Sequence, residues 1–323
     1  MQLTEYVGKS HESENGTQNL LNNPSCYLWY QEKKAATKDK SRVAARKMND
    51  EIVAIYCLCD DILQAMNHRG DAQQQMSDAE VMTTAIVAVV YFYGNFEKAR
   101  KYLTEPQYIP KMLSRSRFNR RLHRVEPMLL MLFECLGQAW KQLNTESVYS
   151  IDSFPIPVCD NIRIPRSKIY DGDEEYRGYQ ASKKRYFYGI KIHLMVTASR
   201  EPVEFFLSSG SFADVKGLRV FPFALPEGSV VYADKAYNDY EIEDLLLEAE
   251  NIQLSAIRKS NSQRPVPGYV QFLQHHKRKV VETTGSLISQ LLPKSIHAVT
   301  AKGFELKVML FVLALSVNLW VAT

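Results

Sequence analysis

Apolar residues follow a helical pattern in the first folded part of the chain. A capping box at 77–80 precedes a run, 81–93, that is apolar on almost every side, as in a helix buried within a bundle. Residues 116–125 place apolar side chains on one face and arginines elsewhere, and an apolar helical pattern follows over about 128–143. Residues 48–145 are therefore expected to form an all-helical region.

The pattern changes after this region. Five short runs are rich in β-branched and aromatic residues and are bounded by Pro, Gly, Ser or Asn, which predicts strands over 148–154, 186–197, 203–207, 229–234 and 252–257. The second and third are joined by a short turn, which indicates a hairpin. A helical pattern separates the fourth and fifth, so these two are expected to be parallel with a right-handed crossover. Residues 146–323 thus predict an α/β domain that ends in helices.

The two ends of the chain differ in character. Residues 1–47 are polar and without periodicity, which predicts a poorly ordered leader with no secretory signal. The apolar run 308–322 is shorter than the ~20 residues of a membrane span and contains Ser316 and Asn318, so a buried helix is expected. Five scattered cysteines without a CxxC pair are typical of a reducing cytoplasm.

Basic residues are unevenly distributed, although 40 Lys and Arg against 36 Asp and Glu leave a net charge of only +4. Residues 106–125 and 251–281 contain no acid but many Lys and Arg. Such stretches are typical of a protein that binds nucleic acid, and a solvated surface is the alternative. The predicted DNA contacts are Arg115, Arg117, Arg120, Arg121, Arg124, Lys183, Lys184, Arg185, Lys191, Arg258, Lys277, Arg278 and Lys279.

Three carboxylates are candidates for chemistry. Asp152 and Asp234 fall near the ends of the first and fourth predicted strands, which can be neighbours in the sheet, and ligands of open α/β sheets bind outside such ends. Glu282 lies on a predicted helix. Two Asp and one Glu offer only oxygen donors, which suits Mg²⁺ or Mn²⁺ better than zinc. Two such ions can assist an in-line phosphoryl displacement.

Spacing alone leaves this set open. An Asp at a strand end is more often a turn residue than a metal ligand. The rival acids are Asp160, Asp171, Asp173, Asp214 and Asp239.

Seven segments together resemble the DDE transposases of bacterial insertion sequences, most closely insertion-sequence family 982, among transposases like those of families 4 and 5. They cover most of residues 48–323 in order: MSDAEVMTTAIVAVVYFYGNFEKARKYL (76–103), SRSRFNRRLHRV (114–125), SIDSFPIPVCDNIRIPR (150–166), KKRYFYGIKIHLMVT (183–197), PVEFFLSSGSFADVKGL (202–218), VYADKAYND (231–239) and KRKVVETTGSLISQLLPKSIHAVTAKGFELKV (277–308). The resemblance implies a ribonuclease H-like mixed five-stranded sheet flanked by helices. It also implies a catalytic triad of Asp152, Asp234 and Glu282 that holds two Mg²⁺ ions, with Mn²⁺ as a substitute.

The chain departs from the wider transposase signature Tyr-x2-Arg-x3-Glu-x6-Lys. Arg278 and Glu282 keep the spacing, but His275 stands at the Tyr position and Ser289 at the Lys position, so the roles of that Tyr and Lys do not carry over. Arg278 is expected either to hold a phosphate or to orient Glu282. The 47 residues between Asp234 and Glu282 suffice for a helix, a strand and a basic loop, and leave no room for an inserted β-domain.

The resemblance predicts a cytoplasmic transposase without membrane attachment. Its helical region would bind the terminal inverted repeats of its element as double-stranded DNA, and its catalytic domain would cleave DNA and transfer strands. Because two DNA ends must be processed together, at least a homodimer is expected on DNA. A metal-dependent nuclease without strand transfer and a catalytically inactive DNA-binding repressor are the alternatives.

Overall fold

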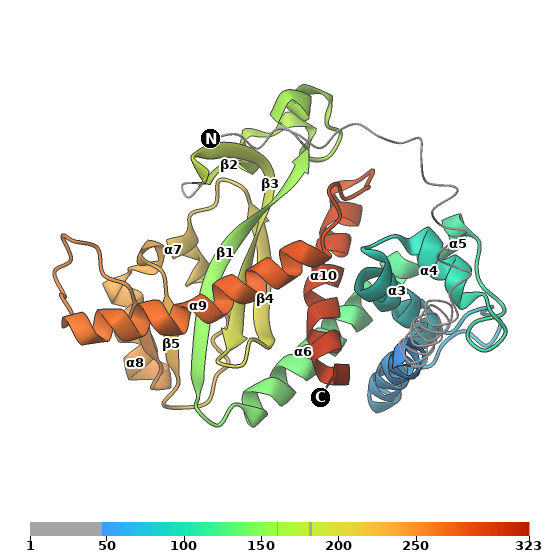
Figure 1. Ribbon diagram of the computed structural model, residues 1–323, viewed down its shortest axis with the longest axis horizontal. Helices are drawn as coiled ribbons and strands as arrows, with labels where there is room; N and C mark the ends of the chain where they lie inside the picture. Colours follow the sequence, from blue (N-terminus) through green and yellow to red (C-terminus); the bar gives the residue numbers. More distant parts are fainter. Residues whose placement is uncertain (1–46, 160, 181–182, 323) are drawn as a thin grey trace, which may run out of the picture. The chain divides into compact units, whose positions relative to one another are not determined.

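The computed structural model describes residues 47–159, 161–180 and 183–322 (Figure 1). Contacts divide the chain into two compact units, Met1–Val53 and Ala54–Thr323. In the first unit the described residues, 47–53, are helical. The predicted leader, 1–47, lies outside the described residues except for Lys47. The fold below is that of the second unit.

The helical part begins with residues 54–65, which are helical. The described residues that follow form the three predicted helices and one more. These are α3 (Asp78–Phe92), α4 (Phe96–Leu103), α5 (Arg115–Arg124) and α6 (Glu126–Leu143), of which α4 was not predicted. The Ser77 side chain accepts a hydrogen bond from the backbone N–H of Glu80, and the Glu80 carboxylate accepts one from that of Ser77, so the predicted capping box starts α3. Residues 85–89 of α3 are buried, as its apolar pattern predicts.

Within the described residues the sheet has six strands, so the prediction of five was wrong. The strands are β1 (Val148–Cys159), β2 (Arg177–Gln180), β3 (Arg185–Thr197), β4 (Pro202–Ser209), β5 (Val230–Ala233) and β6 (Gln253–Ala256), in the order β2-β3-β1-β5-β6 with β4 also on β3. The missed strand, β2, has only four residues and no β-branched side chain, and its pairing with β3 defines it.

The predicted hairpin and the predicted parallel strand pair are confirmed, and the right-handed crossover stays a prediction. β3 and β4 form an antiparallel hairpin, and β5 and β6 are parallel with α8 (Tyr240–Glu250) between them in the chain. β1 runs parallel to β5 and antiparallel to β3. The segment between Asp234 and Glu282 holds a short 3-10 turn, α8, β6, a loop and the first part of α9 (Gly268–Leu291), with no inserted β-domain.

Strand β1 is longer than predicted, because it continues through two prolines to Cys159. Its register with β3 shifts between Pro157 and Cys159. Opposite this shift Gly189 has φ +156°, and a Cβ there would lie 2.2 Å from the carbonyl oxygen of Ile156. Only glycine permits this close approach, which keeps the end of β1 on the sheet.

Two long helices complete the unit. α9 crosses β1, β3 and β5, and α10 (Ala301–Ala322) packs against α3, α6 and β4 (Figure 1). α6 itself lies so close to β4 that a Cβ on Gly137 would stand 2.6 Å from the carbonyl oxygen of Val203. The C-terminal helix therefore packs with helices of the predicted DNA-binding region. The boundaries 48–145 and 146–323 stay a prediction.

Helix α10 was predicted to be buried rather than membrane-spanning. Among the described residues it is the single helix long and apolar enough to cross a membrane, and 67% of its apolar window is buried inside the protein. Residues 308–317 are all buried, as in the core helix of a soluble protein. α3 and α4 pass the same test only when taken together, and they are bent by 113° relative to each other.

Candidate active site

Asp152 and Asp234 lie side by side because of the pairing between β1 and β5. The last residue pair of these parallel strands is Ile151 with Ala233, and the two aspartates follow directly. β5 ends there, whereas β1 continues, so Asp152 lies inside its strand and not at the predicted strand end. The two aspartates are nevertheless neighbours, as expected if their two predicted strands are adjacent in the sheet.

Helix α9 brings Glu282 and Arg278 to the same place. The Arg278 guanidinium contacts three carboxylates: Nη2 lies 3.0 Å from Asp152 Oδ2, Nη1 lies 2.8 Å from Glu282 Oε1, and Nε lies 4.0 Å from Asp234 Oδ1. The three predicted catalytic acids therefore converge on one positively charged group. Arg278 was predicted either to hold a phosphate or to orient Glu282. Its contact with Glu282 is the i, i+4 pairing on which the second role depends.

Small and polar residues fix α9 over the sheet. The Ser150 hydroxyl donates to the carbonyl oxygen of Lys277 at 3.1 Å, and the Gln274 amide, which is buried, donates to Ser255 Oγ at 3.1 Å. At Gly285 a Cβ would meet the Phe154 ring at 3.3 Å, so this helix position lies close to β1. These contacts set the register that presents Arg278 and Glu282 to the aspartates.

Burial dominates the electrostatics of Asp152. It raises the pKa of the Asp152 carboxyl to about 6, while the Arg278 charge and the hydrogen bond from the Ser153 N–H oppose the rise. Asp234 and Glu282 raise the pKa of Asp152 further by repulsion. A group of three neighbouring acids of this kind needs a positive charge at its centre in order to be fully ionised.

Asp214, one of the rival acids, lies in the same cleft, but its carboxylate already accepts hydrogen bonds from other side chains. Its Oδ1 accepts hydrogen bonds from the Ser153 hydroxyl at 2.8 Å and from the Lys191 ammonium at 3.1 Å. Lys191 also donates to the carbonyl oxygen of Phe212 at 2.8 Å. Asp214 therefore anchors the residue next to Asp152.

The other rivals lie elsewhere. Asp239 caps α8 by accepting from the Ile242 N–H, and Asp173 accepts from the Glu175 N–H in a short 3-10 turn. Asp171 has a left-handed backbone conformation beside that turn, and Asp160 lies outside the described residues.

His193 lies on β3 within the core. Its ring stacks on Phe206 with 4.3 Å between ring centroids, its Nε2 pairs with Ser208 Oγ, and its Nδ1 pairs with the Tyr237 hydroxyl. Burial lowers the pKa of His193 to about 4, so the ring is neutral at pH 7. This environment is that of a packing residue.

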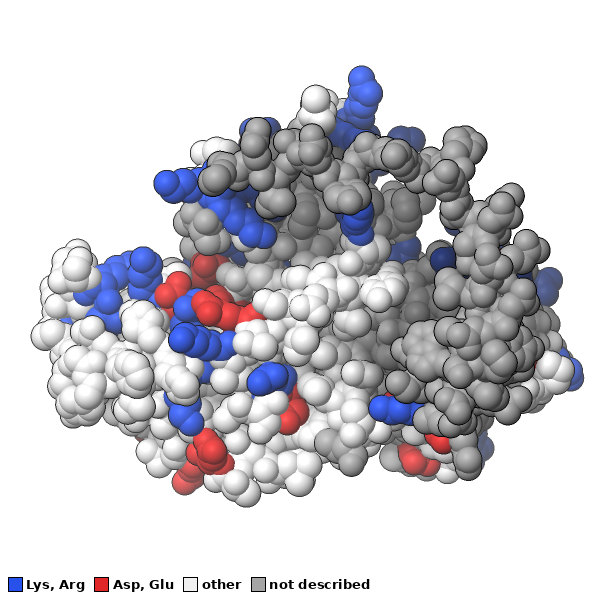
Figure 2. Space-filling model, in the orientation of Figure 1, with Lys and Arg blue, Asp and Glu red and all other residues white. Residues whose placement is uncertain are grey.

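The carboxylates open into a cleft of about 960 Å³. Figure 2 shows acidic side chains gathered at one place on the visible face and bordered by basic ones. The cleft is lined by Asp152, Ser153, Pro155, Tyr179, Gln180, Phe187, Lys191, Asp214, Asp234, Lys235, Ala236, Arg258, Lys259, Ser260, Asn261, Arg278 and Glu282. Lys235 was not among the predicted residues, although it directly follows Asp234. Lys259 lies in the acid-free basic stretch 251–281 but was not named as a DNA contact.

The donor set suits a hard divalent cation. Asp152, Asp234 and Glu282 present carboxylate oxygens only, and these are the ligands that Mg²⁺ and Mn²⁺ prefer. Within the described ranges no three His, Cys, Asp or Glu side chains are already grouped as metal ligands. The guanidinium of Arg278 stands among the three carboxylates instead, so a metal ion fits the chemistry of this site if that group moves aside.

The predicted DNA-binding residues of α5 divide into two groups. Arg115, Arg117, Arg120 and Arg124 are exposed. Arg121 is turned inward, where its Nη2 donates to Gln74 Oε1, to the Met76 carbonyl oxygen and to Asp78 Oδ1 at 2.8, 3.1 and 2.5 Å. The Arg121 guanidinium thus ties α5 to the start of α3, and a DNA contact by this residue stays a prediction.

The basic residues of the sheet region divide in the same way. Lys183, Lys184, Arg185 and Lys279 are exposed. Arg258 makes two hydrogen bonds to Glu243, at 2.5 and 2.8 Å, and Lys277 lies 3.3 Å from Glu146. Together with Lys191, these two residues already have acidic partners within the chain, so the exposed group is the better placed for an external phosphate.

The segment that holds this site matches a known family. Residues 142–296 match the family model described as a transposase DDE domain. No curated protein and no solved structure matches the chain. The matched segment includes all six strands and α9, and a mixed sheet flanked by helices is consistent with the ribonuclease H-like fold. The finer assignment to insertion-sequence family 982 stays a prediction. Over these residues the chain is similar to the DDE domains of transposases, which supports a transposase of an insertion sequence.

Proposed function

We propose that the protein is a DNA transposase that cleaves DNA at the ends of its insertion sequence and joins these ends to target DNA. The observation that carries the proposal is the convergence of Asp152, Asp234 and Glu282 on one guanidinium, within the segment that matches the transposase domain. Three carboxylates in an open cleft provide a cation-binding centre that nothing in the packing of the sheet requires.

The three carboxylates are the proposed ligands of two metal ions. When bound, Mg²⁺, or Mn²⁺ in its place, would supply the charge that activates water or a DNA 3′-hydroxyl and stabilises the departing 3′-oxygen. Asp214 and Lys191 hold Ser153 in place next to Asp152. Arg278, once released from the carboxylates, would be free to pair with a phosphate of the DNA.

Basic residues around the cleft would hold the DNA backbone. Lys235 and Lys259 are exposed and line the cleft beside the carboxylates. The exposed arginines of α5 give the helical region a second positively charged surface. We propose that this helical region binds the inverted repeats as double-stranded DNA, and that the cleft receives the cleavage site.

The assembly and the compartment follow from the reaction. Two DNA ends must be cut and joined in concert, so we propose at least a homodimer on DNA. The DNA substrate lies in the bacterial cytoplasm, so we propose that the protein acts there and needs no membrane.

Cleavage of a labelled duplex that carries the DNA flanking this gene tests the proposal. Wild type, Asp152→Asn, Asp234→Asn and Glu282→Gln are compared in Mg²⁺, in Mn²⁺ and in EDTA. Glu248→Gln is the matched control, because Glu248 is an exposed acid of α8 that does not line the cleft. We expect metal-dependent 3′-hydroxyl ends from wild type and from the control only.

The other outcomes identify the alternatives. Cleavage without joining of the new ends to a second duplex indicates a nuclease. Binding of the flanking DNA by every variant, with no cleavage by wild type, indicates an inactive repressor. Normal cleavage by Asp152→Asn or Asp234→Asn removes the assignment of the site.

A further inference from the structure

A large cavity lies between α6 and β4, and none of the proposed catalytic residues lines it. It has a volume of about 880 Å³ and shares no lining residue with the catalytic cleft. Its walls come from α6, from residues 203–207 of β4, from the loop that follows α7 (Asp214–Gly217), and from Glu305 and Met309 of α10. This α6–β4 cavity therefore belongs neither to the carboxylate site nor to the predicted DNA contacts.

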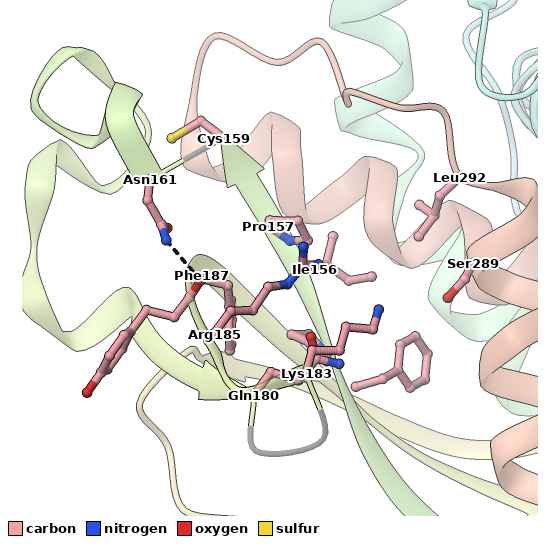
Figure 3. A pocket seen from close by; sticks show the side chains of 13 residues that line it. Ile156, Pro157, Cys159, Asn161, Gln180, Lys183, Arg185, Phe187, Ser289 and Leu292 are labelled. Carbon is pink, nitrogen blue, oxygen red and sulfur yellow. Dashed lines mark hydrogen bonds between the residues drawn. The ribbon is translucent and has the colours of Figure 1, made fainter.

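The α6–β4 cavity is acidic, in contrast to a smaller cavity of about 380 Å³ beside the cleft. The smaller cavity holds Lys183 and Arg185, and none of the described residues that line it is acidic (Figure 3). Among the described residues that line the α6–β4 cavity, Lys141 is the one base and four are acids. The acids are Glu126, Glu134, Glu204 and Glu305. The α6–β4 cavity therefore favours a cationic ligand.

Glu204 is the buried acid of this cavity, with a side chain that is 6% exposed. Its Oε1 accepts a hydrogen bond from Lys141 Nζ at 2.7 Å and one from the Ala224 N–H at 3.1 Å. Its Oε2 is buried and has no hydrogen-bond partner among the described residues. A carboxylate can accept donors on both oxygens, and a buried oxygen without a donor is costly. Oε2 is therefore an acceptor for a donor that comes from outside the chain.

Apolar side chains form the rest of the wall next to Glu204. Phe133 of α6 and Phe205 of β4 meet edge to face with 4.8 Å between ring centroids, and Met309 adds to the wall from α10. Leu130 and Met131 are 38% and 37% exposed. Because the acid is buried and these two apolar side chains are exposed, a ligand enters with its charged end first and keeps its apolar body near the opening.

We propose that the α6–β4 cavity binds a small organic ammonium ion. Its ammonium group donates to Glu204 Oε2, while Lys141 keeps Oε1, and its carbon chain lies against Phe133 and Phe205. A cavity of this volume is within the range of small-molecule sites. A divalent metal ion fits poorly, because it needs several oxygen ligands and Glu204 is the single buried acid among the described lining residues. The site does not depend on the proposed catalytic function.

Calorimetric titration of the full chain with three probes of equal length tests the site. The probes are hexylammonium, hexan-1-ol and hexanoate, in EDTA at pH 7. We expect saturable binding of one hexylammonium per chain, at least about tenfold tighter than that of hexanol, because the hydrogen bond to Glu204 is charge-assisted. Hexanoate should not bind. Shortening the ammonium probe to pentylammonium should weaken binding by about fourfold, as expected for one buried methylene.

Variants locate the charge of the probe. Lys141→Met/Glu204→Gln removes the buried carboxylate and keeps an oxygen for the Ala224 N–H. It should bind hexylammonium no more tightly than hexanol, and its retained affinity for hexanol shows that the cavity is still formed. Glu248→Gln is the control for loss of an acid, since Glu248 is exposed on α8 and does not line the cavity. Glu134→Gln removes an exposed acid that lines the cavity, and a smaller loss is expected there than in the double variant.

A cysteine inside the cavity reports where the probe binds. Cys135 of α6 is exposed and lines the cavity, whereas Cys57 is exposed and does not. We expect saturating hexylammonium to slow alkylation of Cys135 by iodoacetamide by at least about threefold in wild type, since a bound ligand covers the cavity wall. The rate at Cys57, followed in the same sample by peptide mass spectrometry, should not change.

The outcomes separate this site from a general apolar groove. Equal affinity for hexylammonium and hexanol, or the absence of saturable binding, overturns the inference. So does a loss in Glu134→Gln as large as that in the double variant, because it places the ammonium on the exposed acid. Equal slowing at Cys135 and Cys57 also overturns it. If the double variant fails to fold, the comparison of the three probes in wild type and the protection of Cys135 decide the question.

Discussion

The Arg278 guanidinium lies 3.0 Å from the carboxylate of Asp152, and both side chains are mostly buried. The same guanidinium reaches Glu282 and Asp234. One guanidinium therefore contacts all three acids. A divalent ion at these carboxylates would occupy the place that Arg278 now takes, so Arg278 and the metal are expected to compete.

Replacement of Arg278 tests this competition. In EDTA we expect Arg278→Ala to lower the free energy of unfolding by about 2 kcal/mol, because Asp152 loses its partner in a largely buried position. We also expect Mg²⁺ to raise Tm more in Arg278→Ala than in wild type, since no guanidinium has to be displaced. Thermal unfolding across a Mg²⁺ titration measures both effects.

The control for Arg278 is Arg264→Ala. Arg264 pairs with Asp244 at an exposed site outside the cleft, so little change in stability or in the Mg²⁺ response is expected. An equal Mg²⁺ shift in wild type and Arg278→Ala would show that the guanidinium does not stand in the metal's place.

Asp152 is expected to lower the stability of the metal-free protein at neutral pH. Burial raises the pKa of this carboxyl to about 6, so above pH 6 the folded protein holds a buried charge that the unfolded chain keeps in water. Asp152→Asn should therefore raise the free energy of unfolding at pH 7 by up to about 3 kcal/mol while abolishing cleavage. The gain should vanish as pH falls from about 6 to about 4, where wild type becomes protonated.

Urea unfolding in EDTA at several pH values measures this difference, with Glu248→Gln as the control for loss of an exposed acid. A destabilised Asp152→Asn at pH 7 would contradict the expected cost of the buried charge. Arg278→Ala should cost less stability in the Asp152→Asn protein than in wild type, since the two residues are in contact and the charge that Arg278 pairs with is already gone.

Local patterns predicted much of the fold. The capping box at Ser77 marks the start of α3, and the alternation of strand and helix gives the parallel pair β5 and β6. β2 could not be predicted, because four residues without a hydrophobic run become a strand only by pairing with the long β3. The end of β1 was missed because prolines normally end a strand, and here a register shift opposite Gly189 retains them.

The carboxylates of the candidate site could be selected from the sequence. Which basic residues are exposed and which are paired with an acid of the same chain could not be predicted. Charge runs identified Arg121 and Arg258 together with their exposed neighbours. Their partners, Asp78 and Glu243, lie far away in the chain, and only tertiary structure brings them together. The cavity beside the cleft likewise joins residues of β1, β2, β3 and α9, so no local pattern signals it.

This division of the basic residues is itself testable on α5. Arg117→Ala and Arg120→Ala should leave stability unchanged, while each weakens DNA binding and lowers the slope of log affinity against log salt by about one. Arg121→Ala should instead lower the free energy of unfolding by about 1–3 kcal/mol, because Asp78 and the Met76 carbonyl lose their donor. Affinity titrations at several salt concentrations, together with urea unfolding, distinguish the two effects. Equal loss of stability in all three variants would contradict the assignment.

His193 predicts a loss of stability in acid. Burial lowers the pKa of its ring to about 4, so the folded protein keeps His193 neutral while the unfolded chain binds a proton below about pH 6.5. The stabilisation is therefore complete above pH 6.5 and is lost, by up to about 3 kcal/mol, as pH falls to 4. His193→Gln lacks this titration, so its deficit relative to wild type at pH 7 should shrink steadily toward pH 4. A deficit that is constant with pH would show that His193 is not held neutral by the fold.

The buried ion pair between α6 and β4 gives the strongest expected effect on stability. Lys141 Nζ lies 2.7 Å from Glu204 Oε1, and both side chains are about 95% buried. Oε1 also accepts from the Ala224 N–H, whereas the buried Oε2 has no hydrogen-bond partner among the described residues. Lys141→Met therefore leaves an uncompensated buried carboxylate and should cost about 3–5 kcal/mol.

The double variant Lys141→Met/Glu204→Gln removes both charges and keeps an oxygen for the Ala224 N–H. We expect it to recover most of the stability that Lys141→Met loses, because a neutral amide is far less costly to bury than an unpaired carboxylate. Lys277→Met is the matched control, since its partner Glu146 is 61% exposed and such surface pairs contribute at most about 1 kcal/mol. Urea unfolding of the four proteins at pH 7 gives the comparison. If Lys141→Met lost no more stability than Lys277→Met, the pair would not hold a buried charge, and α6 would be bound to β4 by its apolar contacts and the close approach at Gly137 alone.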